Sequence, residues 1–179
     1  LKTLLAVFEL EASDRHQRRV NRLRRASKLP VGKTWESLDR SRFPAKLQQQ
    51  LEDLVTGDFV DRAANVLAFG LPGTGKTHAM AALADRLIEE RRSVLFVPTF
   101  TIVQDLLAAQ RDLDLPRALR QPDHFEVLIL DDLGYPKQRA AEAAVLSTLI
   151  AHPTERPPTL LTSTTVFRQC TATLPATVA

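Results

Sequence analysis

The sequence predicts an α/β domain whose parallel sheet is covered by helices on both faces, preceded by a basic α-helical segment. Short continuous apolar runs alternate with helical segments after residue 65, and a glycine-rich turn follows the first of these runs. Continuous rather than alternating apolar strands are typical of strands that are buried on both faces. The chain has 179 residues, of which 44% are hydrophobic and 25% charged, so it suits one domain with an appendage.

Residues 1–57 are expected to form a basic helical region. Apolar residues recur at helical spacing within 1–28, and no Gly or Pro interrupts this stretch. A second helix is expected over 44–55, because Pro44 suits an early helical position and Gly57 lies just past the end. Residues between these helices are expected to form a linker.

Residues 58–168 are expected to form the α/β core, and 169–179 an irregular tail. The apolar runs predict strands over 66–69, 93–97, 127–130 and 159–162. The segments between them predict helices over 76–91, 102–110 and 138–151.

Composition excludes several classes of protein. The single cysteine, Cys170, cannot form an internal disulfide. No apolar run approaches the roughly 18 residues that span a bilayer, and the start lacks the pattern of a secretory signal. The four histidines are scattered, which does not support a zinc site. We therefore expect a cytoplasmic protein that does not associate with a membrane.

The segment from Gly70 to Thr77 matches the phosphate-loop pattern G-x-x-x-x-G-K-[ST] at every position, between a predicted strand and a predicted helix. Its glycines permit backbone angles and close approaches that a Cβ atom would block. Lys76 is expected to reach the β- and γ-phosphates of a nucleotide, and Thr77 to supply a hydroxyl ligand to Mg²⁺. The expected nucleotide-binding residues are Gly70, Leu71, Pro72, Gly73, Thr74, Gly75, Lys76, Thr77 and His78.

Two carboxylates follow the apolar strand 127–130. Asp131 is expected to hold the Mg²⁺ coordination sphere, and Asp132 to orient or deprotonate the attacking water. The spacing from Thr77 allows two βα crossovers before the acidic strand returns beside the first strand. A single carboxylate at this position often merely caps the next helix, whereas a pair after a phosphate loop favours a catalytic role.

Hydroxyl residues end the strand 159–162. If this strand neighbours the first one, Ser163 or Thr164 is placed to hydrogen-bond the attacking water or the γ-phosphate. An equally good interpretation is that these hydroxyl groups only hydrogen-bond to backbone groups of the loop that follows the strand.

The basic residues concentrate near the start of the chain, since residues 1–60 hold twelve of the 24 basic side chains but eight of the 21 acidic ones. On a helix, Arg15, Arg18, Arg22 and Arg25 share one face, which Arg19 and Lys28 widen. Such a stripe suits the phosphate backbone of double-stranded DNA, with binding that depends steeply on salt. The alternatives are a solvated charged helix and a docking surface for an acidic protein.

These motifs together resemble the IstB/DnaC-like group of AAA+ ATPases, over about residues 4–168. The resemblance rests on Gly70–Thr77, the Leu130–Tyr135 and Leu161–Thr164 segments, residues 56–67, and the arginine-rich helix. It implies a P-loop NTPase fold of the AAA+/RecA-like type that binds ATP and Mg²⁺. It leans toward the ATP-binding helpers of insertion-sequence transposases, and so implies assembly on DNA as a homo-oligomer and a transposase as partner.

Three departures from the group qualify this expectation. The group usually has Asn where this chain has Thr164, and often Glu where it has Asp132. Beyond Phe167 the match stops, and Cys170–Ala179 contains none of the arginines that the group uses as a finger and a second sensor. An arginine finger contributes about 10³–10⁵ in rate, so we expect a truncated chain that binds ATP–Mg²⁺ but hydrolyses ATP slowly and assembles poorly.

The same residues are consistent with other functions. A helicase loader of the same fold would use its N-terminal segment to grip a replicative helicase. A small-molecule P-loop kinase fits less well, because Asp132 and an upstream basic helix are not typical of one. A remnant that binds nucleotide without activity is also consistent. Phe59 and Val60 are the candidates for the wall of the adenine pocket.

Overall fold

A computed structural model describes residues 2–133, 140–151 and 158–164. The α-helices are α1 (Lys2–Ala26), α2 (Ala45–Val55), α3 (Asp58–Asp61), α4 (Lys76–Glu89), α5 (Thr99–Arg111), α6 (Leu115–Arg120) and α7 (Ala140–Ala151). Two 3₁₀ turns are η1 (Arg40–Arg42) and η2 (Pro122–His124). The strands are β1 (Val66–Phe69), β2 (Val94–Pro98), β3 (Val127–Asp131) and β4 (Thr159–Ser163).

The four described strands form one parallel sheet, as the apolar runs predict, and their order in the sheet is β1-β4-β3-β2. One detail of the prediction is wrong: the acidic strand β3 does not lie beside β1, because β4 is inserted between them. Leu160 and Leu161 of β4 are both buried, one against each face of the sheet, which suits a central strand. The hydroxyl residues that end β4 therefore lie between the phosphate loop and the acidic pair.

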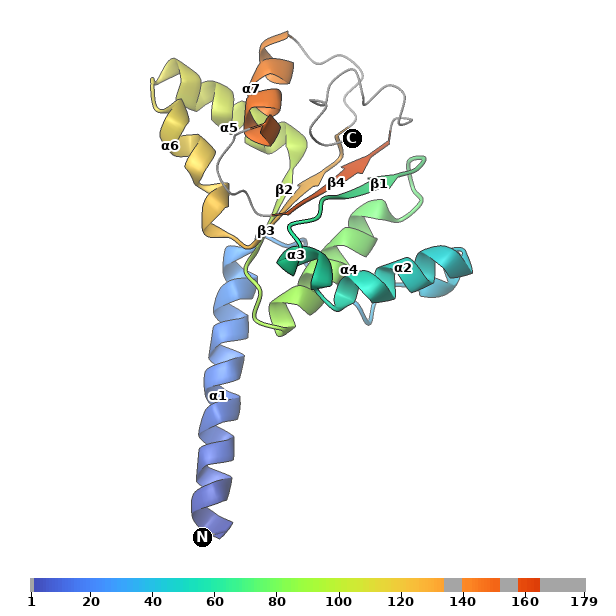
Figure 1. The fold of residues 1–179 in the computed structure, drawn as a ribbon, viewed down its shortest axis with the longest axis vertical. Coiled ribbons are helices and arrows are strands. Elements are labelled where there is room, and N and C mark those ends of the chain that lie inside the picture. Colours follow the sequence, from blue (N-terminus) through green and yellow to red (C-terminus); the bar gives the residue numbers. More distant parts are fainter. Residues whose placement is uncertain (1, 134–139, 152–157, 165–179) are drawn as a thin grey trace.

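Successive residues of each strand point to opposite faces of the sheet and enter two separate cores. On one face, Phe96 and Ile129 pack against helices α1 to α4. On the other face, Val97 and Leu130 pack against α5, α6 and α7. Figure 1 shows these two layers of helices around the sheet. Burial on both faces explains why the strands carry continuous apolar runs.

The structure adds two short helices that the sequence pattern did not predict, α3 and α6. Each is shorter than two turns, so an apolar period cannot distinguish it from a loop. The first helix ends at Ala26, two residues before the predicted end, and Lys28 lies in the turn that follows with φ +57°. Within the described residues, no helix is both long and apolar enough to cross a bilayer.

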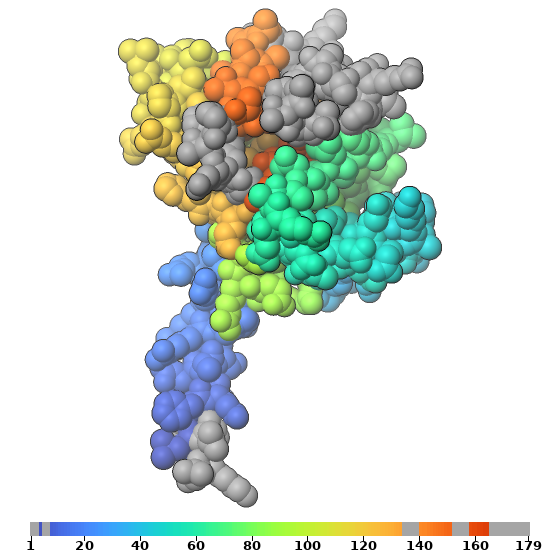
Figure 2. Space-filling view, viewed as in Figure 1, coloured from blue at the N-terminus to red at the C-terminus, as the bar shows by residue number. Residues whose placement is uncertain are grey.

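Helix α1 projects from the body like an arm, and only its C-terminal part packs against the core (Figures 1 and 2). Val20 is buried against α4 and the sheet. The guanidinium of Arg24 donates from Nη2 to Asp85 Oδ1 at 2.6 Å and from Nε to the same oxygen at 2.9 Å. After the helix ends, the carbonyl of Ser27 accepts a hydrogen bond of 2.8 Å from the backbone N–H of Phe96 in β2. The base of the arm is therefore held by packing, an ion pair and a backbone bond.

Replacing Arg24 with methionine is expected to lower the free energy of unfolding by about 2 kcal/mol, measured by urea denaturation. The substitution leaves the carboxylate of Asp85, whose side chain is 6% exposed, without its cation. Breaking a fully buried pair costs about 3–5 kcal/mol, and the expected loss is smaller because the Arg24 side chain is 40% exposed. Arg25→Met removes an exposed charge from the next position and is the control. Equal destabilisation by both variants would contradict the anchoring role of Arg24.

Candidate nucleotide-binding site

The carboxyl ends of three neighbouring strands bring the predicted nucleotide-site residues together. β1 ends in the phosphate loop, β3 ends at Asp131, and β4 ends at Ser163, which pairs with Phe69 of β1. The backbone N–H of Gly70 donates to the carbonyl of Ser163 at 3.3 Å, so the phosphate loop starts directly against the end of β4. Ligands of open parallel sheets bind at this edge.

The phosphate loop has the backbone conformation that its glycines allow. Gly73 and Gly75 lie in the left-handed region, with φ +77° and φ +90°, and α4 begins immediately afterwards at Lys76. The ammonium of Lys76 donates to the carbonyls of Gly70 at 2.7 Å and Leu71 at 2.9 Å. The lysine is thus held across the loop, at the N-terminal end of a helix whose backbone N–H groups favour an anion.

A chain of hydrogen bonds joins the phosphate loop to the acidic pair. Thr77 Oγ1 donates to Asp131 Oδ1 at 3.0 Å, and Thr162 Oγ1 donates to the same oxygen at 2.6 Å. The backbone N–H of Asp132 donates to Thr162 Oγ1 at 2.7 Å, and Thr164 Oγ1 donates to Asp132 Oδ1 at 3.3 Å. Asp131 is 8% exposed, whereas Asp132 faces solvent. One acid is therefore held rigidly beside Thr77, and the other is open to a water molecule.

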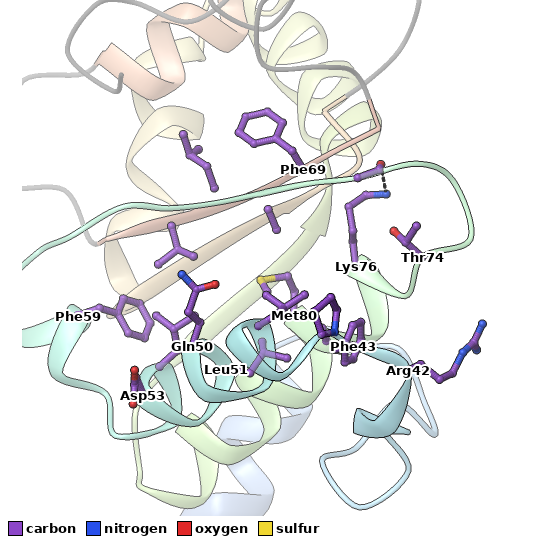
Figure 3. A pocket seen from close by; sticks show the side chains of 18 of the residues that line it. Arg42, Phe43, Gln50, Leu51, Asp53, Phe59, Phe69, Thr74, Lys76 and Met80 are labelled. Carbon is purple, nitrogen blue, oxygen red and sulfur yellow. Dashed lines mark hydrogen bonds between the residues drawn. The ribbon is translucent and has the colours of Figure 1, made fainter.

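An apolar cavity of about 690 Å³ adjoins the phosphate loop, between α2, α3 and β1 (Figure 3). Phe43, Phe59 and Met80 line it, and Lys76 lies at its border with the loop. Val60, the second candidate for the adenine wall, is not among the lining residues and packs against the buried core. The cavity has the size and apolar character of a small-molecule site.

The segment between α1 and α2 also contacts the phosphate loop. Ser37 Oγ lies 3.0 Å from Nε2 of His78, which follows Thr77 in α4. A Cβ atom on Gly75 would lie only 3.3 Å from the ring of Phe43, so this aromatic ring packs directly against the loop. The sequence suggested a linker here, but its contact with the phosphate loop is not visible in any local pattern.

The arginines of the predicted DNA-binding stripe lie on the surface of α1, where Arg15, Arg18, Arg19 and Arg22 line a shallow hollow of about 340 Å³. Arg15 pairs with Glu11 and Arg18 with Asp14, one turn earlier on the same helix, and all four side chains are more than half exposed. Such exposed pairs hold a side chain only weakly.

The other predicted members of the stripe differ in their placement. Within the described part of the chain, no ion pair involves Arg19, Arg22 or Arg25. Lys28 is exposed but follows the helix, so it does not widen the helical face as predicted.

Thr162 is the functional candidate that sequence reasoning did not single out. It is 1% exposed and bonds to both acids. Its one signal in the sequence is that it is the first of the hydroxyl residues after Leu160 and Leu161 of the strand, and this signal is too common to identify a site.

Comparison with known proteins identifies a family whose sequences match this chain. The family model of the IstB-like ATP binding protein matches residues 1–178. A putative insertion sequence ATP-binding protein of Sinorhizobium fredii is 38% identical over 173 residues, which cover 96% of this chain and 58% of that protein. The Insertion sequence IS21 putative ATP-binding protein of Pseudomonas aeruginosa is 32% identical over 164 residues, covering 92% of this chain and 62% of that protein. The chain thus spans less than two thirds of the length of these relatives.

Solved structures share the fold at lower identity. The DnaC helicase loader superposes with a TM-score of 0.60 at 21% identity, covering 74% of this chain and 78% of that one. AMPPCP-bound DnaA from Aquifex aeolicus superposes with a TM-score of 0.64 at 13% identity, covering 82% of this chain and 48% of that one. The described sheet and helices thus have the arrangement of an AAA+ P-loop domain.

Proposed function

Because the chain belongs to the family of IstB-like ATP-binding proteins, we propose that it is an ATP-dependent helper of DNA transposition. It binds ATP–Mg²⁺ at the sheet edge, binds double-stranded DNA through α1, and assists a partner transposase. The observation that carries the proposal is the convergence of the phosphate loop, the Thr77–Asp131 contact and the exposed Asp132 at one edge of the sheet.

The nucleotide would lie along the phosphate loop with its base in the adjoining cavity. The backbone N–H groups of the loop and the start of α4 bind the phosphates. Lys76 exchanges its loop carbonyls for β- and γ-phosphate oxygens, which carry full charge and are stronger acceptors. Phe59 and Phe43 offer apolar surface to the base, because both line the cavity beside the loop.

Thr77 and Asp131 fit a magnesium ion. A hydroxyl oxygen and a carboxylate oxygen lie 3.0 Å apart beside the loop, and Mg²⁺ binds through one or two such protein oxygens together with phosphates and water. When bound, the ion neutralises the charge that develops on the phosphates.

Asp132 and Thr164 are placed to handle the attacking water. Asp132 is exposed at the strand edge and accepts a hydrogen bond of 3.3 Å from Thr164. A carboxylate in this position orients a water molecule and takes its proton. Thr164 keeps the carboxylate turned toward β4 by donating its proton to Asp132, and its hydroxyl oxygen accepts a hydrogen bond from the water.

The arm formed by α1 is the proposed DNA contact. Its arginine face, defined as Arg15, Arg18, Arg22 and Arg25, is exposed. The helix that carries this face projects from the nucleotide-binding body (Figure 2). Contacts to phosphates from such a face are independent of base sequence. We propose that the chain works in the cytoplasm, on DNA, as a homo-oligomer beside the transposase.

A helicase loader is the alternative function, since the DnaC helicase loader and DnaI share the fold. In that case the exposed arm would bind a replicative helicase instead of a transposase. The neighbouring gene separates the two, because a transposase gene favours the first function and a replication gene the second.

One titration tests the proposal. We expect a fluorescent ATP analogue to bind the chain with Mg²⁺, and saturating ATP to raise the affinity for duplex DNA about tenfold, a typical coupling between two sites. An assay of phosphate release then measures turnover. ATP binding without any effect on DNA affinity would contradict the coupling of the arm to the nucleotide site, and absence of ATP binding would contradict the whole proposal.

A further inference from the structure

Thr162 of β4 binds the segment that carries the two acids with both its hydroxyl and its carbonyl. Its hydroxyl donates to Asp131 Oδ1 at 2.6 Å and accepts from the backbone N–H of Asp132 at 2.7 Å. Its carbonyl accepts from the backbone N–H of Leu133 at 2.7 Å. The residue is 1% exposed, so water does not compete for these bonds. Burying a hydroxyl costs free energy unless it is hydrogen-bonded. Here the acidic segment supplies both an acceptor for the hydroxyl proton and a donor to the hydroxyl oxygen.

The first bond determines how the Asp131 carboxylate is turned. Oδ1 of Asp131 accepts hydrogen bonds from Thr77 and Thr162, which approach from α4 and from β4. The Thr162 bond is the shorter of the two and comes from inside the sheet. It holds Oδ1 against β4 even when Thr77 binds another partner, and so restrains the orientation of the whole carboxylate.

The other two bonds hold the turn that carries Asp132. Asp132 has φ +58°, in the left-handed region that residues other than glycine adopt infrequently. Such a conformation persists where its surroundings hold it. Thr162 binds the N–H groups of Asp132 and of the next residue, one with its hydroxyl and one with its carbonyl. The direction in which Asp132 leaves the sheet edge therefore depends on Thr162.

We propose that Thr162 is the positioning residue of the acidic pair, orienting the Asp131 carboxylate toward Mg²⁺ and holding the turn that presents Asp132. The inference rests on the proposed ATP–Mg²⁺ site and adds to it a residue that touches neither the nucleotide nor the ion. Residues that orient a metal ligand commonly change metal affinity or activity by 10- to 100-fold when replaced.

Three variants of the full chain test this role. Thr162→Val has nearly the same shape and removes the hydroxyl, whereas Thr162→Ser keeps the hydroxyl. Thr99→Val is the matched control, because Thr99 is 3% exposed and donates to the backbone carbonyl of Asp131 at 2.9 Å without touching its carboxylate. The measurement is the affinity of a fluorescent ATP analogue as a function of Mg²⁺ concentration, together with kcat and KM for ATP.

Mg²⁺ should raise the affinity for the nucleotide, and we expect Thr162→Val to increase the Mg²⁺ concentration that gives half of this rise by about 10- to 100-fold. The affinity for the nucleotide without Mg²⁺ should stay at the wild-type level. Thr162→Ser should restore the wild-type Mg²⁺ response, and Thr99→Val should retain it. The change in Thr162→Val should appear in kcat at saturating ATP more than in KM, because the loop that binds the phosphates is unchanged.

The outcomes separate the two levels of the proposal. If wild-type protein binds ATP but does not respond to Mg²⁺, the proposed metal site fails, and the role of Thr162 fails with it. If wild type responds and Thr162→Val responds equally, only the role of Thr162 is overturned. An equal shift in Thr99→Val also overturns it, because general loosening of the strand then explains the effect. Should Thr162→Val not fold, Thr162→Cys replaces it, since the thiol fills the volume but donates weakly.

Discussion

Replacing Lys76 with alanine is expected to lower the affinity for ATP by about 100-fold, equivalent to roughly 2.7 kcal/mol. A hydrogen bond to a charged group contributes about 1.5–3 kcal/mol, and in the proposed complex the ammonium binds the phosphates, the most highly charged part of ATP. In the structure its donors already point across the loop, to the carbonyls of Gly70 and Leu71. The measurement is calorimetric titration with ATP in the presence of Mg²⁺.

Two controls accompany this variant. Lys46→Ala removes an exposed cation from α2 that does not line the cavity beside the phosphate loop, and its ATP affinity should equal that of wild type. Thermal unfolding of Lys76→Ala tests whether loss of the two carbonyl contacts unfolds the loop and the domain together. A folded Lys76→Ala chain that binds ATP as tightly as wild type would remove the basis of the proposed nucleotide site.

Reversing three charges on the arginine face, in the triple variant Arg18→Glu, Arg22→Glu and Arg25→Glu, is expected to weaken duplex DNA binding and its salt dependence. Each phosphate contact contributes about 0.9 to the slope of log affinity against log salt, so the slope should fall by about 2.7. The pair of Arg18 with Asp14 does not prevent this, because both side chains are more than two-thirds exposed. Fluorescence anisotropy of a labelled duplex at several salt concentrations measures both quantities.

The matched control carries the same charge change on the opposite side of the sheet. Arg111, Arg117 and Arg120 belong to α5 and α6 and are exposed, and their reversal to glutamate should leave most of the DNA affinity and its salt slope intact. ATP affinity should be unchanged in both triple variants, which shows that the body is folded. If reversal on the arginine face changes neither quantity, α1 does not bind DNA, and docking to an acidic protein becomes the better interpretation of the stripe.

Much of the fold follows from local patterns. Strand β1 has the predicted bounds, Val66–Phe69, because a turn of glycines ends its apolar run. The acidic strand extends one residue further than predicted and includes Asp131, since a carboxylate that accepts two hydroxyl bonds can be buried at a strand end. Among the described elements, the short helices α3 and α6 and the 3₁₀ turns η1 and η2 escaped prediction, for lack of a full apolar period.

The candidate site was only partly predictable. The phosphate loop has a dense sequence pattern, so its residues and conformation could be anticipated from Gly70 to Thr77. The predicted helix end at 28 was wrong by two residues, which moved Lys28 off the helix, because helix ends depend on capping and packing that apolar spacing does not report. The apolar cavity beside the loop combines Phe43 with side chains from α2, α3, α4 and β1, which no single stretch of sequence brings together.

By itself, the sequence determined the α/β class, the phosphate loop, the acidic pair and the arginine-rich helix, because each depends on neighbouring residues and their periodicity. Only the tertiary structure decided that β4 lies between β1 and β3, and hence that Thr162 stands between the two acids. The order of the strands depends on which helices pack against each of the two faces of the sheet. Connections of similar length between consecutive strands are compatible with more than one order. The contacts that orient the site are therefore made between segments distant in sequence, where local patterns carry no information.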